Sequence, residues 1–164
     1  MANTYTSLHY HVVFSTKNRQ PFLGEAIRER LFAYLGGISR ENGMKALEIG
    51  GVADHVHLLL SIPASLAVSK AVQFVKGGSS HWLKATFPNM IDFAWQDGYA
   101  AFTVSQSQVD DVRAYICSQP EHHRTKTFFE EYRAFLVRRI VLNTMSVTSW
   151  VSFSRRYATR QLHT

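Results

Sequence analysis

Two histidines stand two residues apart in the apolar segment DHVHLLLSIP, residues 54–63. Successive side chains of a β-strand point to opposite faces, so His55 and His57 are expected to share one face. Neutral imidazole is a common ligand of divalent metals, and two rings at this spacing are close enough to share one ion. Two ligands do not complete a site, however. Two half-exposed strand histidines that bind nothing fit the spacing as well.

A tyrosine and a glutamine stand four residues apart in YICSQPEHH, residues 115–123. On a helix Tyr115 and Gln119 would lie on the same face. A phenol oxygen can act as a covalent nucleophile, and an amide oxygen is a hard ligand of the kind that Mg²⁺ or Mn²⁺ accepts. Such a metal polarises a phosphoryl oxygen. The pattern therefore supplies a nucleophile and a third ligand.

A plainer interpretation exists for the same helix. Tyr115 flanks the apolar stripe of the helix, which makes it a half-buried aromatic, and Gln119 is then an ordinary polar residue at a helix end. The stripe itself consists of Val109, Val112 and Ile116. Three residues that follow are either alternative metal ligands or a solvated turn: Glu121, His122 and His123.

Periodicity predicts the elements that must position these residues. Alternating, β-branched and aromatic segments predict strands at 8–17, 44–52 and 54–63, with a bend or tight turn at Gly50–Gly51 between the last two. Helical spacing predicts helices at 24–43, 65–88 and 107–119, the second interrupted at Gly77–Gly78 and the third capped by Ser107. Residues 93–105 predict a strand pair, or one strand that follows a turn at Asp97–Gly98.

The order β-α-β-β-α-β, followed by more helix, predicts an α+β fold of the ferredoxin-like split βαβ type. Its antiparallel sheet is covered by helices on one face. Val56, Leu58 and Leu60 would point to that covered face. The two histidines would then stand on the open face, which is free to carry an active site.

Composition indicates one globular domain with a separate basic end. Of the 164 residues, 46% are hydrophobic and 18% charged, and the net charge of +6 favours a polyanionic partner such as nucleic acid. Residues 1–137 hold 13 Lys and Arg against all 12 Asp and Glu, whereas residues 138–164 hold five Arg and no acid. The single cysteine, Cys117, excludes an internal disulfide. We expect a cytoplasmic protein, since no apolar run could span a membrane and no signal peptide begins the chain.

Taken together, the His-hydrophobic-His strand and the Tyr-x-x-x-Gln helix some sixty residues later resemble the single-tyrosine HUH transposases of the TnpA type, from small bacterial insertion sequences. The resemblance extends over about residues 5–137. Its further blocks are LHYHVVFSTKNRQPFL, FVKGGSSHWLK, WQDGYAAFTVS and YICSQPEHHRTKTFFEEYRAFL. Each motif alone is weak, but jointly they are specific.

The resemblance implies a DNA transposase on the ferredoxin-like fold. His55, His57 and Gln119 fall on the metal ligands of the family, with Mg²⁺ or Mn²⁺ as the cofactor, and Tyr115 falls on the nucleophile. In such enzymes the tyrosine attacks single-stranded DNA, is joined to the 5′ phosphate and releases a 3′ hydroxyl. The DNA ends are recognised as hairpins. Members of this length are usually homodimers, in which the tyrosine helix of one chain completes the metal site of the other.

Several basic and aromatic residues are candidate DNA contacts. Lys17, Arg19 and Lys76 are plausible phosphate contacts, and Lys84 fits ordinary solvated charge better. The segment of Gly77, Gly78, Ser79 and Ser80 offers backbone N–H groups to a phosphate. Four aromatic residues are candidates for stacking on unpaired bases, although most of them fit a core position better: Trp82, Trp95, Tyr99 and Phe102.

The end of the chain departs from the family. After a block like FEEYRAFL the family usually continues with an acidic, aromatic segment of the type IEYDERYLW, whereas this chain reads IVLNTMSVTSWVSFSRRYATRQLHT. One choice of codons for residues 140–151, read from its third base, encodes CIEYDERYVLG. We therefore interpret residues 1–137 as the catalytic domain and residues 138–164 as an atypical basic tail, for which a shifted reading frame is a hypothesis that the gene sequence tests.

Two other functions compete with the transposase. A non-catalytic single-stranded nucleic-acid-binding module uses the same kind of sheet, but it needs stacking aromatics where this chain has histidines. A metal-dependent phosphoesterase would use water in place of Tyr115.

Overall fold

A computed structural model describes residues 5–119 of the chain. The predicted boundary at residue 137 and the basic tail lie outside the described residues. So do three candidate ligands of the sequence analysis: Glu121, His122 and His123.

The described elements alternate as the sequence pattern predicts. The strands are β1 (His9–Ser15), β2 (Lys45–Val52), β3 (His55–Ser61) and β4 (Ala100–Val104). The α-helices are α1 (Glu25–Glu41), α2 (Val68–Thr86) and α3 (Val109–Cys117). Short 3₁₀ turns are η1 (Lys17–Arg19), η2 (Pro88–Met90) and η3 (Gln106–Gln108). Within the described residues, no helix is both long and apolar enough to cross a membrane.

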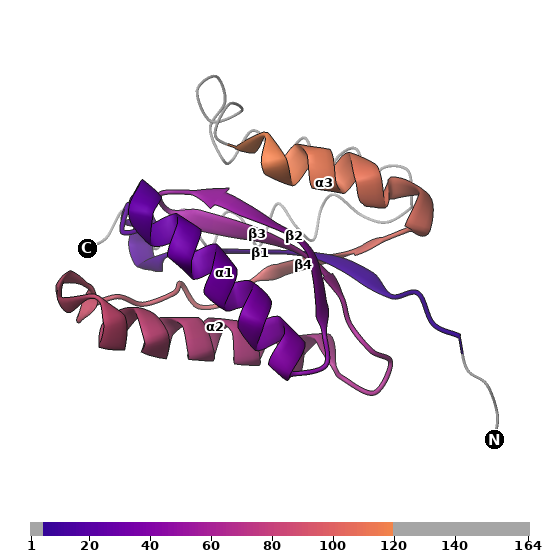
Figure 1. Cartoon of the computed structure of the whole chain (residues 1–164), viewed down its shortest axis with the longest axis horizontal. Helices are drawn as coiled ribbons and strands as arrows, with labels where there is room; N and C mark the ends of the chain where they lie inside the picture. Colours follow the sequence, from indigo (N-terminus) through magenta and orange to yellow (C-terminus); the bar gives the residue numbers. More distant parts are fainter. Residues whose placement is uncertain (1–4, 120–164) are drawn as a thin grey trace, which may run out of the picture. The chain divides into compact units, whose positions relative to one another are not determined.

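The four strands form one antiparallel sheet in the order β2-β3-β1-β4. Helices α1 and α2 lie on one face of this sheet, and α3 lies on the other (Figure 1). The predicted α+β fold of split βαβ type is therefore confirmed. The face opposite α1 and α2 is not open, because α3 covers part of it.

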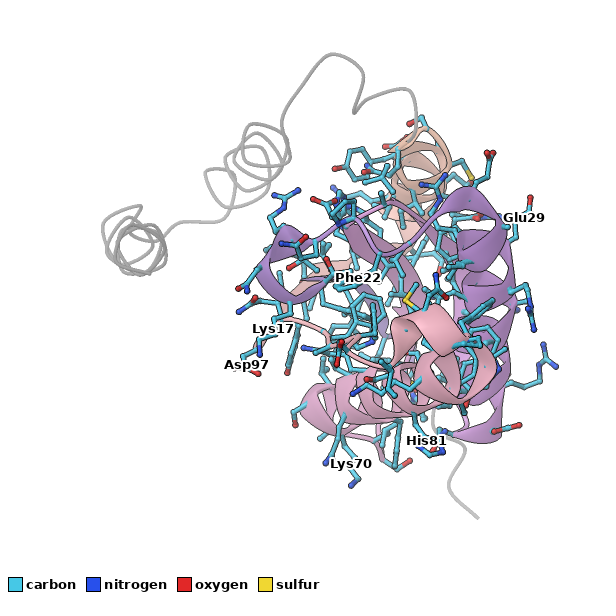
Figure 2. All side chains as sticks on the ribbon, turned by 90° about the vertical axis from the view of Figure 1, so that its left-hand side faces the viewer. Lys17, Phe22, Glu29, Lys70, His81 and Asp97 are labelled. Carbon is cyan, nitrogen blue, oxygen red and sulfur yellow. The ribbon has the colours of Figure 1, made fainter. Side chains whose placement is uncertain are left out.

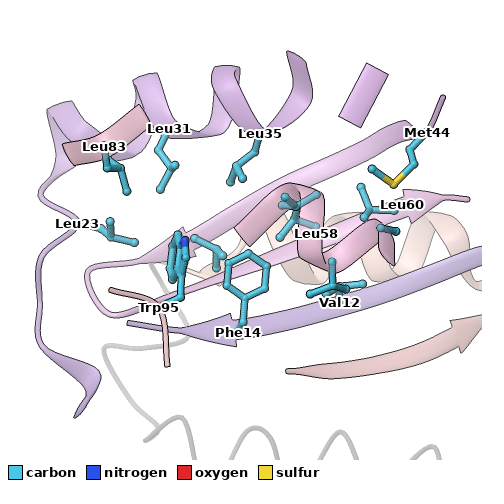
Figure 3. Close-up of a cluster of buried hydrophobic side chains, with 14 of the residues drawn as sticks. Val12, Phe14, Leu23, Leu31, Leu35, Met44, Leu58, Leu60, Leu83 and Trp95 are labelled. Atoms are coloured by element: carbon cyan, nitrogen blue, oxygen red, sulfur yellow. The ribbon is translucent and has the colours of Figure 1, made fainter. Parts of the chain in front are cut away.

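The main core lies between the sheet and the pair α1–α2 (Figure 3). Val56, Leu58 and Leu60 of β3 point into it, as their alternation with the histidines predicts. Leu31 and Leu35 of α1 are completely buried against them. Burial of one such side chain stabilises the fold by about 1.5–3 kcal/mol, so this layer holds the sheet that carries the histidines.

The predicted turn at Gly50–Gly51 is wrong. Strand β2 runs through both glycines to Val52, and the turn falls at Ala53–Asp54. A Cβ atom at Gly51, where φ is +156°, would lie 2.9 Å from Cα of Val56 on the paired strand. The glycines therefore serve close packing around β2 rather than a reversal of the chain.

The predicted interruption of the second helix is also wrong, because α2 is continuous through Gly77 and Gly78. A Cβ atom at Gly78 would collide with Cδ1 of Ile38, so this glycine lets α1 and α2 approach closely. A glycine inside a helix costs about 1 kcal/mol relative to alanine, a cost that such packing offsets.

Ser107 does not cap α3. It lies within η3, and its Oγ is 3.1 Å from Oγ of Ser105.

Candidate metal and nucleophile site

The two histidines of β3 lie on the face that α3 covers. Both rings are buried, with 0% of His55 and 3% of His57 exposed. The alternative of half-exposed strand histidines is therefore wrong. The rings stand 5.0 Å apart, centroid to centroid, at an angle of 71°. Burying two imidazoles this completely requires polar partners, since a buried polar group without one costs free energy.

Asp54 is the partner of His55. Oδ1 of Asp54 lies 2.7 Å from Nδ1 of His55, and Oδ2 accepts hydrogen bonds from Nε and Nη2 of Arg19 at 2.9 and 2.6 Å. Burial raises the pKa of Asp54, but its hydrogen bonds with His55 and Arg19 outweigh burial and lower this pKa to about 2. The carboxylate is thus ionised and can only accept. Nδ1 of His55 must therefore carry the proton, and Nε2 is the nitrogen able to bind a metal.

The partner of His57 is His11 of β1, a residue that neither sequence motif contains. Its Nε2 lies 3.0 Å from Nδ1 of His57, and the two rings stack at 5.2 Å. His11 is 1% exposed. The signal was present in LHYH, where His9 and His11 show the same spacing of two, but the pairing of β1 with β3 is what brings the rings together.

Helix α3 brings the tyrosine to these rings. Val109, Val112 and Ile116 are buried against Leu59 and Val104 of the sheet, as the predicted apolar stripe requires. This docking leaves Tyr115 half-buried, with its ring edge-on to His57 at 5.7 Å and 83°. The same ring is 6.0 Å from His11. The structure therefore brings Tyr115 and the histidines of one chain together.

Gln119 follows one turn after Tyr115 and is completely buried. Within the described part of the chain, neither Oε1 nor Nε2 of its amide has a hydrogen-bond partner. Such a group costs about 1–3 kcal/mol unless something else satisfies it. An amide oxygen together with two imidazole Nε2 atoms is a donor set that suits a divalent cation such as Mn²⁺ or Mg²⁺. The residues present thus fit a metal that uses an amide ligand.

A site made only of the usual charged or imidazole ligands is not seen. Among residues 5–119 no group of three or more His, Cys, Asp and Glu is placed to hold a metal ion. A third ligand for the histidine pair would therefore be of another chemical kind, such as the amide oxygen of Gln119, or would come from beyond the described range.

The three basic candidates for DNA contact differ in their surroundings. Lys17 is exposed, and Figure 2 shows it projecting outward. Arg19 is ion-paired with Asp54. Nζ of Lys76 donates to the backbone oxygens of Gln96 and Gly98 at 2.6 and 2.7 Å. Burial lowers the pKa of Lys76, and the nearby charge of Asp97 opposes this. Lys76 thus holds the loop before β4.

The predicted phosphate cradle at Gly77–Ser80 is wrong. These residues lie in the middle of α2, where backbone N–H groups bond to the carbonyl four residues earlier. The side chain of Ser79 donates to the oxygen of Val75 and accepts from Nε1 of Trp95. Both groups belong to the core between α2 and the sheet.

The aromatic candidates for base stacking separate in the same way. Trp95 is a core residue, and Trp82 stacks on Tyr34 of α1 at 4.6 Å in the α1–α2 layer. Phe102 lies on the histidine face, 6.5 Å from His11. Tyr99 is 43% exposed. Phe102 and Tyr99 are thus the candidates placed near β4, outside the main core.

Comparison with known proteins gives a consistent picture. Residues 4–119 match the profile of a family described as "Transposase IS200 like". The chain is 32% identical over 131 residues to the transposase for insertion sequence element IS200 of Salmonella typhimurium, with 76% of this chain and 84% of that protein covered. It is 29% identical over 117 residues to the ISDra2 transposase TnpA of Deinococcus radiodurans, covering 68% and 84%.

Solved structures share the fold. A crystal structure of a protein from Deinococcus radiodurans superposes with a TM-score of 0.58 and 26% identity, covering 73% of this chain and 96% of that one. The REP-associated tyrosine transposase, solved bound to a REP hairpin, superposes with a TM-score of 0.56. The two sequences are 14% identical, and the superposition covers 75% of this chain and 73% of the other.

Proposed function

Because the chain belongs to the family of IS200-like transposases, we propose that it cleaves and rejoins single-stranded DNA at the ends of an insertion sequence, with Tyr115 as the nucleophile. The observation that supports this most directly is the position of the Tyr115 ring, edge-on to His57 and next to His11. This position sets a phenol, which can act as a covalent nucleophile, beside imidazoles that can bind a metal ion.

In the proposed reaction Oη of Tyr115 attacks a phosphorus atom of the DNA backbone. The new bond joins the tyrosine to the 5′ phosphate, the bond to the 3′ oxygen breaks, and a 3′ hydroxyl leaves. A 3′ hydroxyl from another end then attacks the phosphotyrosine and releases Tyr115. One ester replaces another at each step, so the reaction requires no external energy source.

His55, His57 and Gln119 are proposed to hold a divalent cation, Mg²⁺ or Mn²⁺. When bound, this cation would polarise a phosphoryl oxygen and stabilise the negative charge that develops on it. The protein's own contribution is orientation. The hydrogen bond of His55 Nδ1 with Asp54 leaves Nε2 of His55 to bind the metal, and donation from Nδ1 of His57 to Nε2 of His11 would leave Nε2 of His57 for the same purpose.

The proposed DNA partner is single-stranded DNA with hairpin ends, which the family resemblance implies. A fold relative solved bound to a REP hairpin agrees with this. We also propose a homodimer in which α3 of each chain completes the site of the other. In the described chain α3 lies over its own histidines, so such an exchange would replace one docked helix by an identical one.

The test is a covalent trapping assay. The protein is incubated with labelled single-stranded hairpin DNA and Mn²⁺, and the mixture is denatured before electrophoresis. We expect a protein–DNA adduct in the wild type and none in Tyr115→Phe, which retains the ring that packs against His57 but lacks the nucleophile. A phosphoesterase would cut without an adduct, and a binding module would shift the DNA without cutting it. Either outcome would overturn the proposal.

A further inference from the structure

Asp54 precedes the first histidine of the DHVH segment, and the reaction described above does not assign it a role beyond its hydrogen bond. Both of its carboxylate oxygens nevertheless have hydrogen-bond partners, which fix the orientation of the side chain. One carboxylate oxygen contacts Nδ1 of His55, and the other accepts two hydrogen bonds from the guanidinium of Arg19. The backbone oxygen of Asp54 also accepts from N and Oγ1 of Thr16, at 2.9 and 3.2 Å.

Arg19 reaches Asp54 through an unusual backbone. It and its neighbour Asn18 both have positive φ, 55° and 53°, which is the left-handed region that residues with a side chain rarely adopt. A residue with a side chain persists in this region only where the surrounding structure enforces it. Here the η1 turn after β1 directs the side chain of Arg19 toward Asp54, in the turn before β3.

We propose that Asp54 is the positioning residue for the metal ligand His55, and that Arg19 acts on metal binding through Asp54 rather than through a DNA phosphate. The inference rests on the proposed function, because it assumes that His55 binds the cation. With Oδ2 held by the guanidinium, Oδ1 keeps a fixed direction toward Nδ1. The ring of His55 is then held in one tautomer and one orientation, and the nearby negative charge makes Nε2 a stronger ligand.

The first experiment measures binding of Mn²⁺ alone to the full-length, metal-free protein by titration calorimetry. Asp54→Ala should weaken Mn²⁺ binding by about 10- to 100-fold, the usual cost of losing a group that orients a metal ligand. Asp54→Asn retains a hydrogen-bond acceptor, so its Mn²⁺ affinity should fall less than that of Asp54→Ala. Asp92→Asn, which removes the same charge from an exposed position in the loop after α2, should bind as the wild type does.

Arg19 is tested by a matched pair that removes one positive charge from the same turn. Arg19→Gln should weaken Mn²⁺ binding, whereas Lys17→Gln should leave it unchanged. If Arg19 were instead a phosphate contact, Arg19→Gln would weaken binding of hairpin DNA and leave Mn²⁺ affinity at the wild-type value. That result would overturn the assignment of Arg19.

A second readout requires no metal. In ¹⁵N spectra of the histidine rings of the metal-free protein, His55 should carry its proton on Nδ1. Asp54→Ala should give a mixture of tautomers while the circular dichroism spectrum stays unchanged. Wild-type Mn²⁺ affinity with an unchanged tautomer in Asp54→Ala would overturn the inference. If the wild type itself binds no Mn²⁺, the proposed metal site fails, and the tautomer alone still decides whether Asp54 positions His55.

Discussion

Gly50 of β2 lies directly beneath Ile116 of α3. A Cβ atom at Gly50 would stand 2.7 Å from the backbone oxygen of Ile116 and 2.8 Å from its Cγ2. Real Cβ atoms do not approach other heavy atoms so closely, so any side chain at this position must displace the helix. The seat of α3 on the sheet, and with it the position of Tyr115 one residue earlier, depends on this glycine.

Gly50→Ala should therefore disturb the site without touching a proposed ligand. We expect the free energy of unfolding to fall by about 1–3 kcal/mol, the cost of overpacking, and adduct formation by Tyr115 to fall with it. The control is Gly37→Ala in α1, where no atom stands within 4 Å of the added Cβ and stability should rise by about 0.5–1 kcal/mol. Unchanged stability and activity in Gly50→Ala would show that α3 is seated differently.

Gln119 should destabilise the metal-free protein and contribute to metal binding. Its amide is buried without a hydrogen-bond partner in the described part of the chain, so Gln119→Met should raise the free energy of unfolding of the metal-free protein by about 1–3 kcal/mol. Mn²⁺ at about 100 times its dissociation constant should stabilise the wild type by about 2.7 kcal/mol and the variant far less. Chemical denaturation with and without Mn²⁺ measures both effects. Equal stabilisation of the two proteins would remove Gln119 from the ligand set.

Lys76 and Lys17 should respond differently to loss of charge. Lys76→Met removes two hydrogen bonds to the loop before β4, so we expect stability to fall by about 1–3 kcal/mol and the salt dependence of DNA binding to stay unchanged. Lys17 is exposed, so Lys17→Met should keep stability within about 0.5 kcal/mol and reduce the slope of log affinity against log salt by about 1. A reduced slope in Lys76→Met would restore its role as a phosphate contact.

Mixing two inactive proteins tests exchange of α3 between chains. Tyr115→Phe and His57→Ala each lack one part of the proposed site. In a homodimer with exchanged helices, each mixed dimer contains one site with both parts, so about a quarter of wild-type activity should return. The mixture is refolded together and assayed for the covalent adduct. No recovery would mean that each chain completes its own site, with α3 docked on the sheet as it is in the described chain.

The face of the sheet on which each residue of β3 lies could be predicted from sequence alone. Side chains alternate along a strand, so the pattern His55-Val56-His57-Leu58 separates a polar face from a core face wherever the strand lies in the sheet. A second local rule, the spacing of three or four residues along one helix face, predicted the stripe of Val109, Val112 and Ile116 with Tyr115 beside it. Both periodicities are properties of the backbone, and burial of the apolar side selects them.

Glycine pairs in the sequence did not predict where the chain turns. Gly50–Gly51 and Gly77–Gly78 predicted a turn and an interruption, yet both pairs lie inside regular elements. A glycine permits a turn, but it equally permits a neighbouring backbone or side chain to come close. Only the packing of α3 on Gly50 and of Ile38 on Gly78 decides which use applies.

The sequence by itself determined the alternation that gathers His55 and His57 on one face and the helical spacing that presents Tyr115 with Gln119. Only the tertiary structure decided the partners of these groups: Arg19 with Asp54, 35 residues apart, and His11 with His57, 46 residues apart. The physical reason is the range of the interactions. Periodicity is set by neighbours in the chain, whereas a hydrogen bond between two strands exists only after the sheet has paired in one register.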